Sequence, residues 1–213
     1  MTEKTFPTDI YTEPTVDVNT LANLGPLTGL AGIWEGTMGV DIAPKAPGPE
    51  RRVFHEHSEF HPIDPQTNGP QLFYGLRYHT QIRAEGEEFL FHNQLGFWLW
   101  EPATNVIIQT LAIPRGQIAM AQGIAEPGAK KLHLHAMRGS TEYGICSNVF
   151  IEHAFRTDSY TLDIVFNNDG SWSYAQDTVM MVQGQKEPFH HKDNNRMVKI
   201  GEPLPNPAMQ AKK

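Results

Sequence analysis

Histidine is the residue type that most clearly suggests chemistry in this chain. Ten of the 213 residues are histidine, at positions 55, 57, 61, 79, 92, 133, 135, 153, 190 and 191. A neutral imidazole is the commonest metal ligand, and it is the side chain that ordinarily changes charge near neutral pH. The spacing of these residues along predicted strands decides which of them can share a site.

One segment places several such groups on a single face. The two-residue period of a strand aligns His55, His57, Glu59 and His61. Three nitrogens and a carboxylate would suit Zn or Fe(II), as in a metal-dependent enzyme of the cupin type. We favour the alternative that Phe54 and Phe60 bury the other side of the strand while the histidine row faces solvent. His133 and His135 alternate with leucines and are expected to face solvent too.

Other catalytic signatures are missing from the sequence. Cys146 is the single cysteine, which excludes an internal disulfide, a CxxC redox pair and a multi-thiolate zinc site. It lies in an apolar run, so we expect a buried, inert thiol. There is no GxSxG, GxxxxGK[ST] or HExxH motif. The sequence therefore gives little support to hydrolytic catalysis and indicates no catalytic residue.

Charge and hydropathy narrow the choice of partner and compartment. Seventeen basic and twenty-four acidic residues give a net charge of −7, and an acidic surface repels phosphate backbones, so we expect no nucleic acid partner. No stretch approaches the roughly 20 apolar residues of a membrane span. The first residues also lack the apolar core of a secretory signal. We expect a soluble, cytoplasmic protein without a membrane partner.

The chain divides into two tails and one domain. Residues 1–28 predict an extended N-terminal arm, and 201–213, with three prolines and a dibasic end, predict a flexible tail. Residues 29–200 form one domain of short runs rich in β-branched and aromatic residues, separated by turn signals. The predicted strands are 30–40, 52–61, 71–83, 87–100, 105–113, 116–124, 131–137, 144–156, 160–167, 171–182 and 189–200.

These runs predict an all-β fold. No long stretch has the 3.6-residue apolar period of crossover helices, and turns such as Pro114-Arg115-Gly116 predict hairpins. The longer runs suit the tilted strands of a closed barrel. We therefore predict an antiparallel up-and-down β-barrel of about ten strands, with room inside for a small-molecule ligand. The sequence is compatible with a homodimer and does not fix the oligomeric state.

The first run carries Gly32-Ile33-Trp34-Glu35-Gly36. Glycine permits close backbone approach, and a large aromatic side chain at this position can plug one end of a barrel.

Several motifs, taken in order, resemble one known family. They are Gly29 to Gly36, Glu56 to Phe60, His92-Asn93-Gln94-Leu95-Gly96-Phe97-Trp98, Pro114-Arg115-Gly116 and Pro188-Phe189-His190-His191. Together they resemble the nitrobindin family of heme-binding β-barrels and its fatty-acid-binding-protein-like relatives. The resemblance implies a calycin-type barrel that holds ferric heme b and binds nitric oxide or isomerises peroxynitrite to nitrate. It leaves open whether this protein is an enzyme.

The closing strand of the family supplies the heme ligand, which by this resemblance is His191, with His190 as the alternative. Basic residues on the even positions of 189–200 mark that face as outward. The odd face, which we expect inside, carries Phe189, His191, Asp193, Asn195 and Met197. We predict that His191 binds the iron and that either Asp193 or a backbone carbonyl accepts its second N–H. Phe189 and Met197 are predicted to contact the cofactor, the methionine by filling space rather than by binding iron.

His92 matches the family position on the opposite side of the heme. The apolar odd face of 87–100 would aim Phe91 inward and His92 outward, and a β-bulge near Asn93 would admit both.

The chain departs from the family pattern in two places. Residues 192–195 are polar where the family has leucine and a small residue, which predicts a wetter wall. Residues 62–70 form a longer turn, which predicts a lid over the mouth. The alternative function is a metal-free carrier of a small, lipid-like apolar molecule in the same barrel.

Overall fold

The computed structural model describes residues 6–211, which form twelve strands and four short helices. The strands are β1 (Gly32–Ala43), β2 (Glu50–Pro62), β3 (Gln66–Asn68), β4 (Gln71–Ala84), β5 (Leu90–Glu101), β6 (Val106–Ile113), β7 (Gln117–Ile124), β8 (Lys131–Arg138), β9 (Gly144–Ser147), β10 (Phe155–Phe166), β11 (Trp172–Val182) and β12 (Phe189–Gly201). The helices are the 3-10 helices η1 (Thr20–Asn23) and η2 (Gly25–Leu30), and the α-helices α1 (Val149–Ala154) and α2 (Pro207–Gln210).

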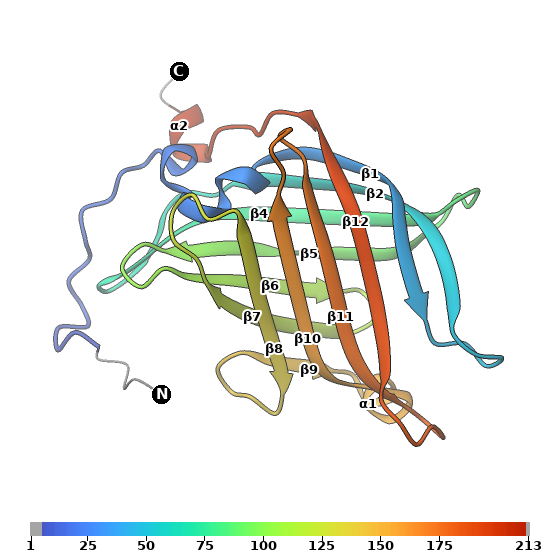
Figure 1. Ribbon diagram of the computed structural model, residues 1–213. Helices are drawn as coiled ribbons and strands as arrows, with labels where there is room; N and C mark the ends of the chain where they lie inside the picture. Colours follow the sequence, from blue (N-terminus) through green and yellow to red (C-terminus); the bar gives the residue numbers. More distant parts are fainter. Residues whose placement is uncertain (1–5, 212–213) are drawn as a thin grey trace.

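The strands close into a barrel (Figure 1). The first strand pairs with the last, for example Ile33 with Gly201, and β2 pairs directly with β4. Ten strands thus form a continuous circuit, and β9 joins it between β7 and β8 as an eleventh. All pairings are antiparallel except that of β8 with β9. The predicted all-β, mainly antiparallel barrel of about ten strands is confirmed.

One predicted strand, 144–156, is wrong because a helix interrupts it. The side chain of Asn148 accepts hydrogen bonds from the backbone N–H groups of Phe150 and Ile151, which caps and starts α1. The short strand before this helix leaves Cys146 exposed, contrary to the expected buried thiol.

The predicted extended arm, residues 1–28, differs from the structure from residue 20 onward. Residues 20–23 form η1 and residues 25–30 form η2, and Leu24, Leu27 and Leu30 are fully buried. Residues three apart are eclipsed in a 3-10 helix, so this spacing puts the three leucines on one face. The two helices lie over one end of the barrel (Figure 1), and the three leucines belong to the core cluster. Residues 1–5 of the predicted arm lie outside the described residues.

The segment after β12 also returns to this closed end, which differs from a flexible tail. Asn206 is fully buried, accepts a hydrogen bond from the Thr20 N–H, and donates to Val18 O (2.9 Å) and Asp64 Oδ1 (2.6 Å). Because Asp64 belongs to the turn 62–70, that turn packs at the closed end and is no lid over the mouth.

Aromatic side chains fill the closed end. Trp34 donates its indole N–H to Leu30 O (2.7 Å), and its ring meets Trp172 edge-on at 5.8 Å between centroids. Phe60 contacts the same tryptophan at 5.9 Å. The expected plugging role of Trp34 is confirmed. With the core at this end, the other end of the barrel is left hollow.

Candidate functional site

The hollow end of the barrel contains a cavity of about 610 Å³. This volume is within the range of about 300–1,000 Å³ typical of sites for small molecules and cofactors. Trp98 and Trp172 line its base, and Pro44, Arg115 and Phe150 line its mouth. Because the sequence places alternate residues of each strand inside, side chains from β1, β2, β4, β5, β6, β10, β11 and β12 reach this one space.

His191 projects from β12 into this cavity, as its predicted inward face requires. Its Nε2 lies 2.7 Å from Asp41 Oδ1 and 3.7 Å from Asp193 Oδ1. Asp41 is only 1% exposed, and its other oxygen accepts from Arg52 Nη2 at 2.7 Å. His190 points outward and pairs with Asp177 instead. Of the two candidates, His191 is therefore the one that can reach a bound ligand.

Asp41, His191 and Asp193 form a cluster in which each side chain affects the pKa of the others. Burial raises the pKa of Asp41, but hydrogen bonds from His191 and Arg52 lower it further than burial raises it. Burial lowers the pKa of His191, yet the hydrogen bond to Asp41 and the charge of Asp193 raise it above its ordinary value. Burial also raises the pKa of Asp193. Within the described chain, these three residues form the group with metal-ligand geometry.

Phe91 and His92 both line the cavity, but not for the expected reason. Ile82 pairs with His92 and Arg83 with Leu90, so the bulge falls at Phe91 rather than near Asn93. After the bulge the even residues of β5 point inward. The predicted inward odd face is wrong there, since Leu95 and Phe97 are 53% and 44% exposed.

His92 is held as a neutral imidazole. Burial, followed by the nearby charge of Arg115, lowers the pKa of His92 to about 4. Its Nε2 lies 3.2 Å from Gln94 Oε1, so the N–H on this nitrogen donates to the amide oxygen.

Two further predicted contacts fall outside the cavity wall. Phe189 is partly buried at the start of β12, and Met197 is fully buried against the closed end. The cavity-lining side chains of the described residues include neither.

Glu56 is a functional candidate that the sequence reasoning missed. It is 6% exposed and lines the cavity, where it accepts hydrogen bonds from Ser58 Oγ (2.9 Å), Tyr174 Oη (2.8 Å) and Asn195 Nδ2 (3.2 Å). Burial raises the pKa of its carboxyl. The sequence could have indicated this position, because Glu56 lies two residues after Phe54 and therefore on the apolar, inward face of β2.

Two hydrogen-bonded tyrosines, Tyr78 and Tyr160, also line the cavity. Tyr78 accepts a hydrogen bond from Gln94 Nε2 (2.6 Å), and Tyr160 donates to Gln109 Oε1 (2.9 Å). Burial raises the pKa of both phenols, which keeps them protonated. The cavity is thus lined by buried polar groups as well as by aromatic rings.

The histidine row of β2 lies on the outside of the barrel. Glu59 is within 3.3–3.4 Å of His57 and His61, and these contacts face away from the cavity. His133 is exposed and pairs with Asp163 at 2.7 Å. The cupin-type metal set therefore has no support from the fold.

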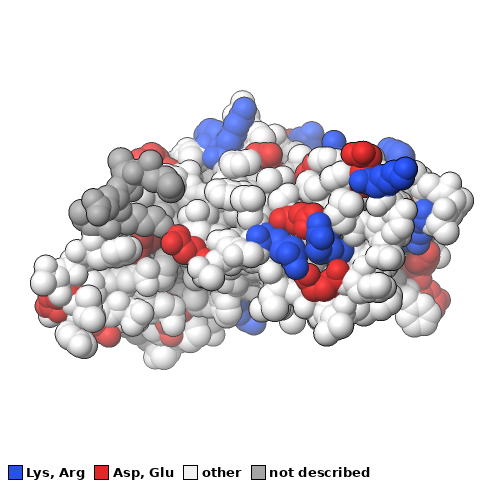
Figure 2. Space-filling model, turned by 90° about the horizontal axis from the view of Figure 1, so that it is seen from below, with Lys and Arg blue, Asp and Glu red and all other residues white. Residues whose placement is uncertain are grey.

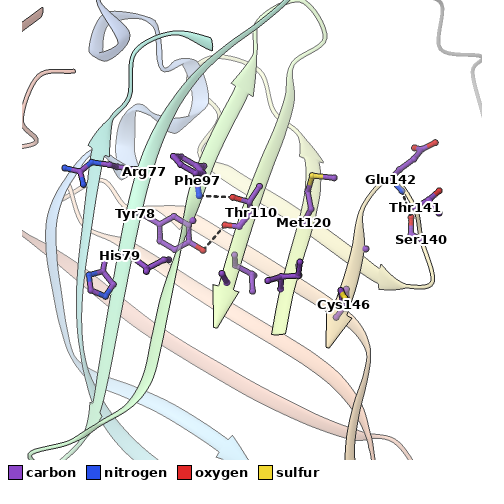
Figure 3. A pocket seen from close by; sticks show the side chains of 18 of the residues that line it. Arg77, Tyr78, His79, Phe97, Thr110, Met120, Ser140, Thr141, Glu142 and Cys146 are labelled. Carbon is purple, nitrogen blue, oxygen red and sulfur yellow. Dashed lines mark hydrogen bonds between the residues drawn. The ribbon is translucent and has the colours of Figure 1, made fainter. Parts of the chain in front are cut away.

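A groove of about 830 Å³ also lies on the outer surface, between β4–β7 and the loop before β9 (Figure 3). Figure 3 shows Phe97 donating its backbone N–H to Thr110 Oγ1, and Tyr78 donating to Thr110 O. The outward odd side chains of β5 line it. The groove also has a histidine–carboxylate contact, from His61 to Glu59, but this contact is 3.4 Å long and Glu59 is exposed. The Asp41–His191 contact is 2.7 Å long with Asp41 buried, so the internal cavity is the candidate site.

Comparison with known proteins identifies a family and similar solved structures. The family model described as "THAP4-like, heme-binding beta-barrel domain" matches residues 23–199. The solved structure titled "Crystal Structure of Rv2717c from M. tuberculosis" has 19% sequence identity and a TM-score of 0.61, covering 86% of this chain and 99% of that chain. At this identity the likeness shows the fold alone. No curated protein matches the sequence. Among the described residues, no helix has the length and apolarity needed to cross a membrane.

Proposed function

The chain belongs to the THAP4-like, heme-binding β-barrel domain family, and on this premise we propose that its cavity binds ferric heme b with His191 as the iron ligand. The observation that carries the proposal is the imidazole of His191, which enters the cavity beside a buried carboxylate. Family membership favours this function over the metal-free carrier.

The residues that line the cavity fit a heme group. Asp41 accepts the Nε2 proton of His191, which fixes the tautomer and leaves the lone pair on Nδ1 for a metal. Apolar side chains that suit a porphyrin face line the same cavity. These are Phe54, Ile82, Phe91, Ile113, Leu162 and Met180. Asp193 Oδ1 lies 3.7 Å from His191 Nε2, so a second carboxyl group is close to the imidazole.

The side chains around the proposed heme site determine what a bound heme would do there. Ferric heme supplies a Lewis-acidic iron that can take nitric oxide or peroxynitrite, and we propose one of these as the ligand. His92, neutral at pH 7, presents a polar ring from β5. Arg52 donates a hydrogen bond to Asp41 and so helps to orient the carboxylate that accepts from His191.

Titration of the purified protein with hemin tests the proposal. We expect a saturable one-to-one shift of the Soret band in the wild type. His191→Ala is expected to lose that shift, whereas His190→Ala, which removes the adjacent outward imidazole, is expected to keep it. A wild type without saturable binding, or a His191→Ala variant that binds like the wild type, would contradict the proposal.

The reaction has its own test. Stopped-flow mixing of peroxynitrite with the heme-loaded protein is expected to raise the decay rate and the nitrate yield above those of the heme-free protein. An unchanged nitrate yield would leave nitric oxide binding as the function.

A further inference from the structure

Arg115 is an unpaired cation at the mouth of the cavity. It lines the cavity, and its Nη1 donates to Phe91 O at 3.2 Å, on the neighbouring strand β5. Arg52, at the same end, pairs with Asp41 and Glu50. No carboxylate of the described residues lies within ion-pair distance of Arg115.

Two other arginines on this side of the barrel form ion pairs. Acidic and basic side chains lie side by side on the face shown in Figure 2. Arg138 pairs with Glu152 at 2.6 Å and Arg156 with Asp158 at 2.8 Å. Arg115 keeps its charge available for a ligand.

The turn that carries Arg115 is held in a fixed shape. Gly116 N–H donates to Ile113 O (3.0 Å), with Pro114 at the second position of the turn. Gly116 has φ +82°, and a Cβ there would come within 2.7 Å of Asn148 Nδ2. Asn148 donates from its side chain to Arg115 O and from its backbone to Gly116 O (2.8 Å). The backbone that carries the Arg115 side chain is thus held in place, and the guanidinium itself donates to Phe91 O.

The charge of Arg115 acts on both sides of the cavity mouth. It lowers the pKa of His92 on β5 and opposes the rise in the pKa of His191 on β12. Arg115, His92 and His191 line the same cavity.

We propose that Arg115 binds a carboxylate of the porphyrin and so holds the carboxylate-bearing edge of the macrocycle at the mouth. This inference rests on the proposed function. A planar guanidinium fork matches a carboxylate, which heme b carries on one edge only. A small anion shares this chemistry, and the experiment separates the two.

The test compares hemin with hemin dimethyl ester, whose carboxylates are blocked, in one buffer with a small fixed fraction of dimethyl sulfoxide. We expect Arg115→Gln to weaken hemin binding roughly fivefold and to leave ester binding unchanged. Arg51→Gln is the matched control, because Arg51 is an exposed arginine on the outer face of β2 at the same end of the barrel. It is expected to change neither affinity. Added salt should weaken hemin binding more in the wild type than in Arg115→Gln.

Three outcomes overturn the inference. Equal affinities of wild type and Arg115→Gln for hemin, with the Soret shift still dependent on His191, refute it and leave the proposed function standing. Equal weakening of hemin and its ester, together with weaker azide binding by the loaded variant, assigns Arg115 to a small anion instead. No hemin binding by any form removes the inference and the proposed function together.

Discussion

Replacing Asp41 by asparagine tests whether the cluster beneath His191 is a buried electrostatic unit. Asp41 Oδ1 lies 2.7 Å from His191 Nε2, and Oδ2 lies 2.7 Å from Arg52 Nη2. Asparagine keeps the size of the side chain and removes its charge. Both cationic partners then lose their counter-charge at once, in a position where Asp41 itself has almost no access to water.

The expected cost follows from the exposure of the three side chains. Removing one partner of a fully buried ion pair costs about 3–5 kcal/mol. Asp41 is 1% exposed, but Arg52 and His191 are 25% and 26% exposed and can recover part of their hydration. We therefore expect Asp41→Asn to lower the free energy of unfolding of the heme-free protein by about 2 kcal/mol at pH 7.

The chain offers a matched control. Asp163 contacts His133 at the same 2.7 Å, but both side chains are about 60% exposed. Asp163→Asn should cost less than about 0.5 kcal/mol. Urea denaturation followed by tryptophan fluorescence measures both variants. Equal losses in the two would refute the reasoning, because burial would then make no difference to an identical contact.

The pH dependence of this loss has a defined sign. The folded pKa of Asp41 is lowered, so its contribution is present above the unfolded value and is lost as pH falls through the folded value. The folded pKa of His191 is raised, so its contribution is present below the unfolded value and is lost as pH rises through the folded value. The difference between wild type and Asp41→Asn should therefore be largest at intermediate pH.

Three further results are expected. Asn206→Ala should lower the free energy of unfolding by about 2 kcal/mol, because it leaves Val18 O and Asp64 without their buried donor; a loss below about 0.5 kcal/mol in urea denaturation would show that the contact is not formed in solution. His92→Gln should lose about 2 kcal/mol less stability than the wild type between pH 6.5 and pH 4, because the pKa of His92 falls to about 4 on folding; parallel pH profiles would contradict this. Burial raises the pKa of Glu56, so the wild type should lose stability relative to Glu56→Gln as pH rises above the unfolded value, and a constant difference would contradict the burial argument.

The placement of His191 could be predicted from sequence because one face of its strand is marked. Lys192 and Arg196 occupy alternate positions of β12, and burying either charge would be costly. The other face must then point inward, and Asp193 follows with it. The partner that holds the imidazole could not be predicted, since Asp41 is 150 residues away along the chain. The closing pair of first and last strands brings them together.

The strand of His92 shows the opposite case. Large apolar residues occupy both faces of β5, so alternation did not distinguish inside from outside. A single extra residue at Phe91 then reverses the facing of everything after it. Trp98 is buried and Phe97 exposed for that reason.

By itself the sequence determined the fold class, the closed barrel, the plugging tryptophan and the inward face of the last strand, because these depend on the local period of apolar and charged side chains. Only the tertiary structure decided which carboxylate meets His191, where Glu56 and Arg115 lie in the cavity, and how residues 20–30 close the other end. Those features depend on register and on contacts between distant strands. Local pattern carries no information about either until the sheet has closed.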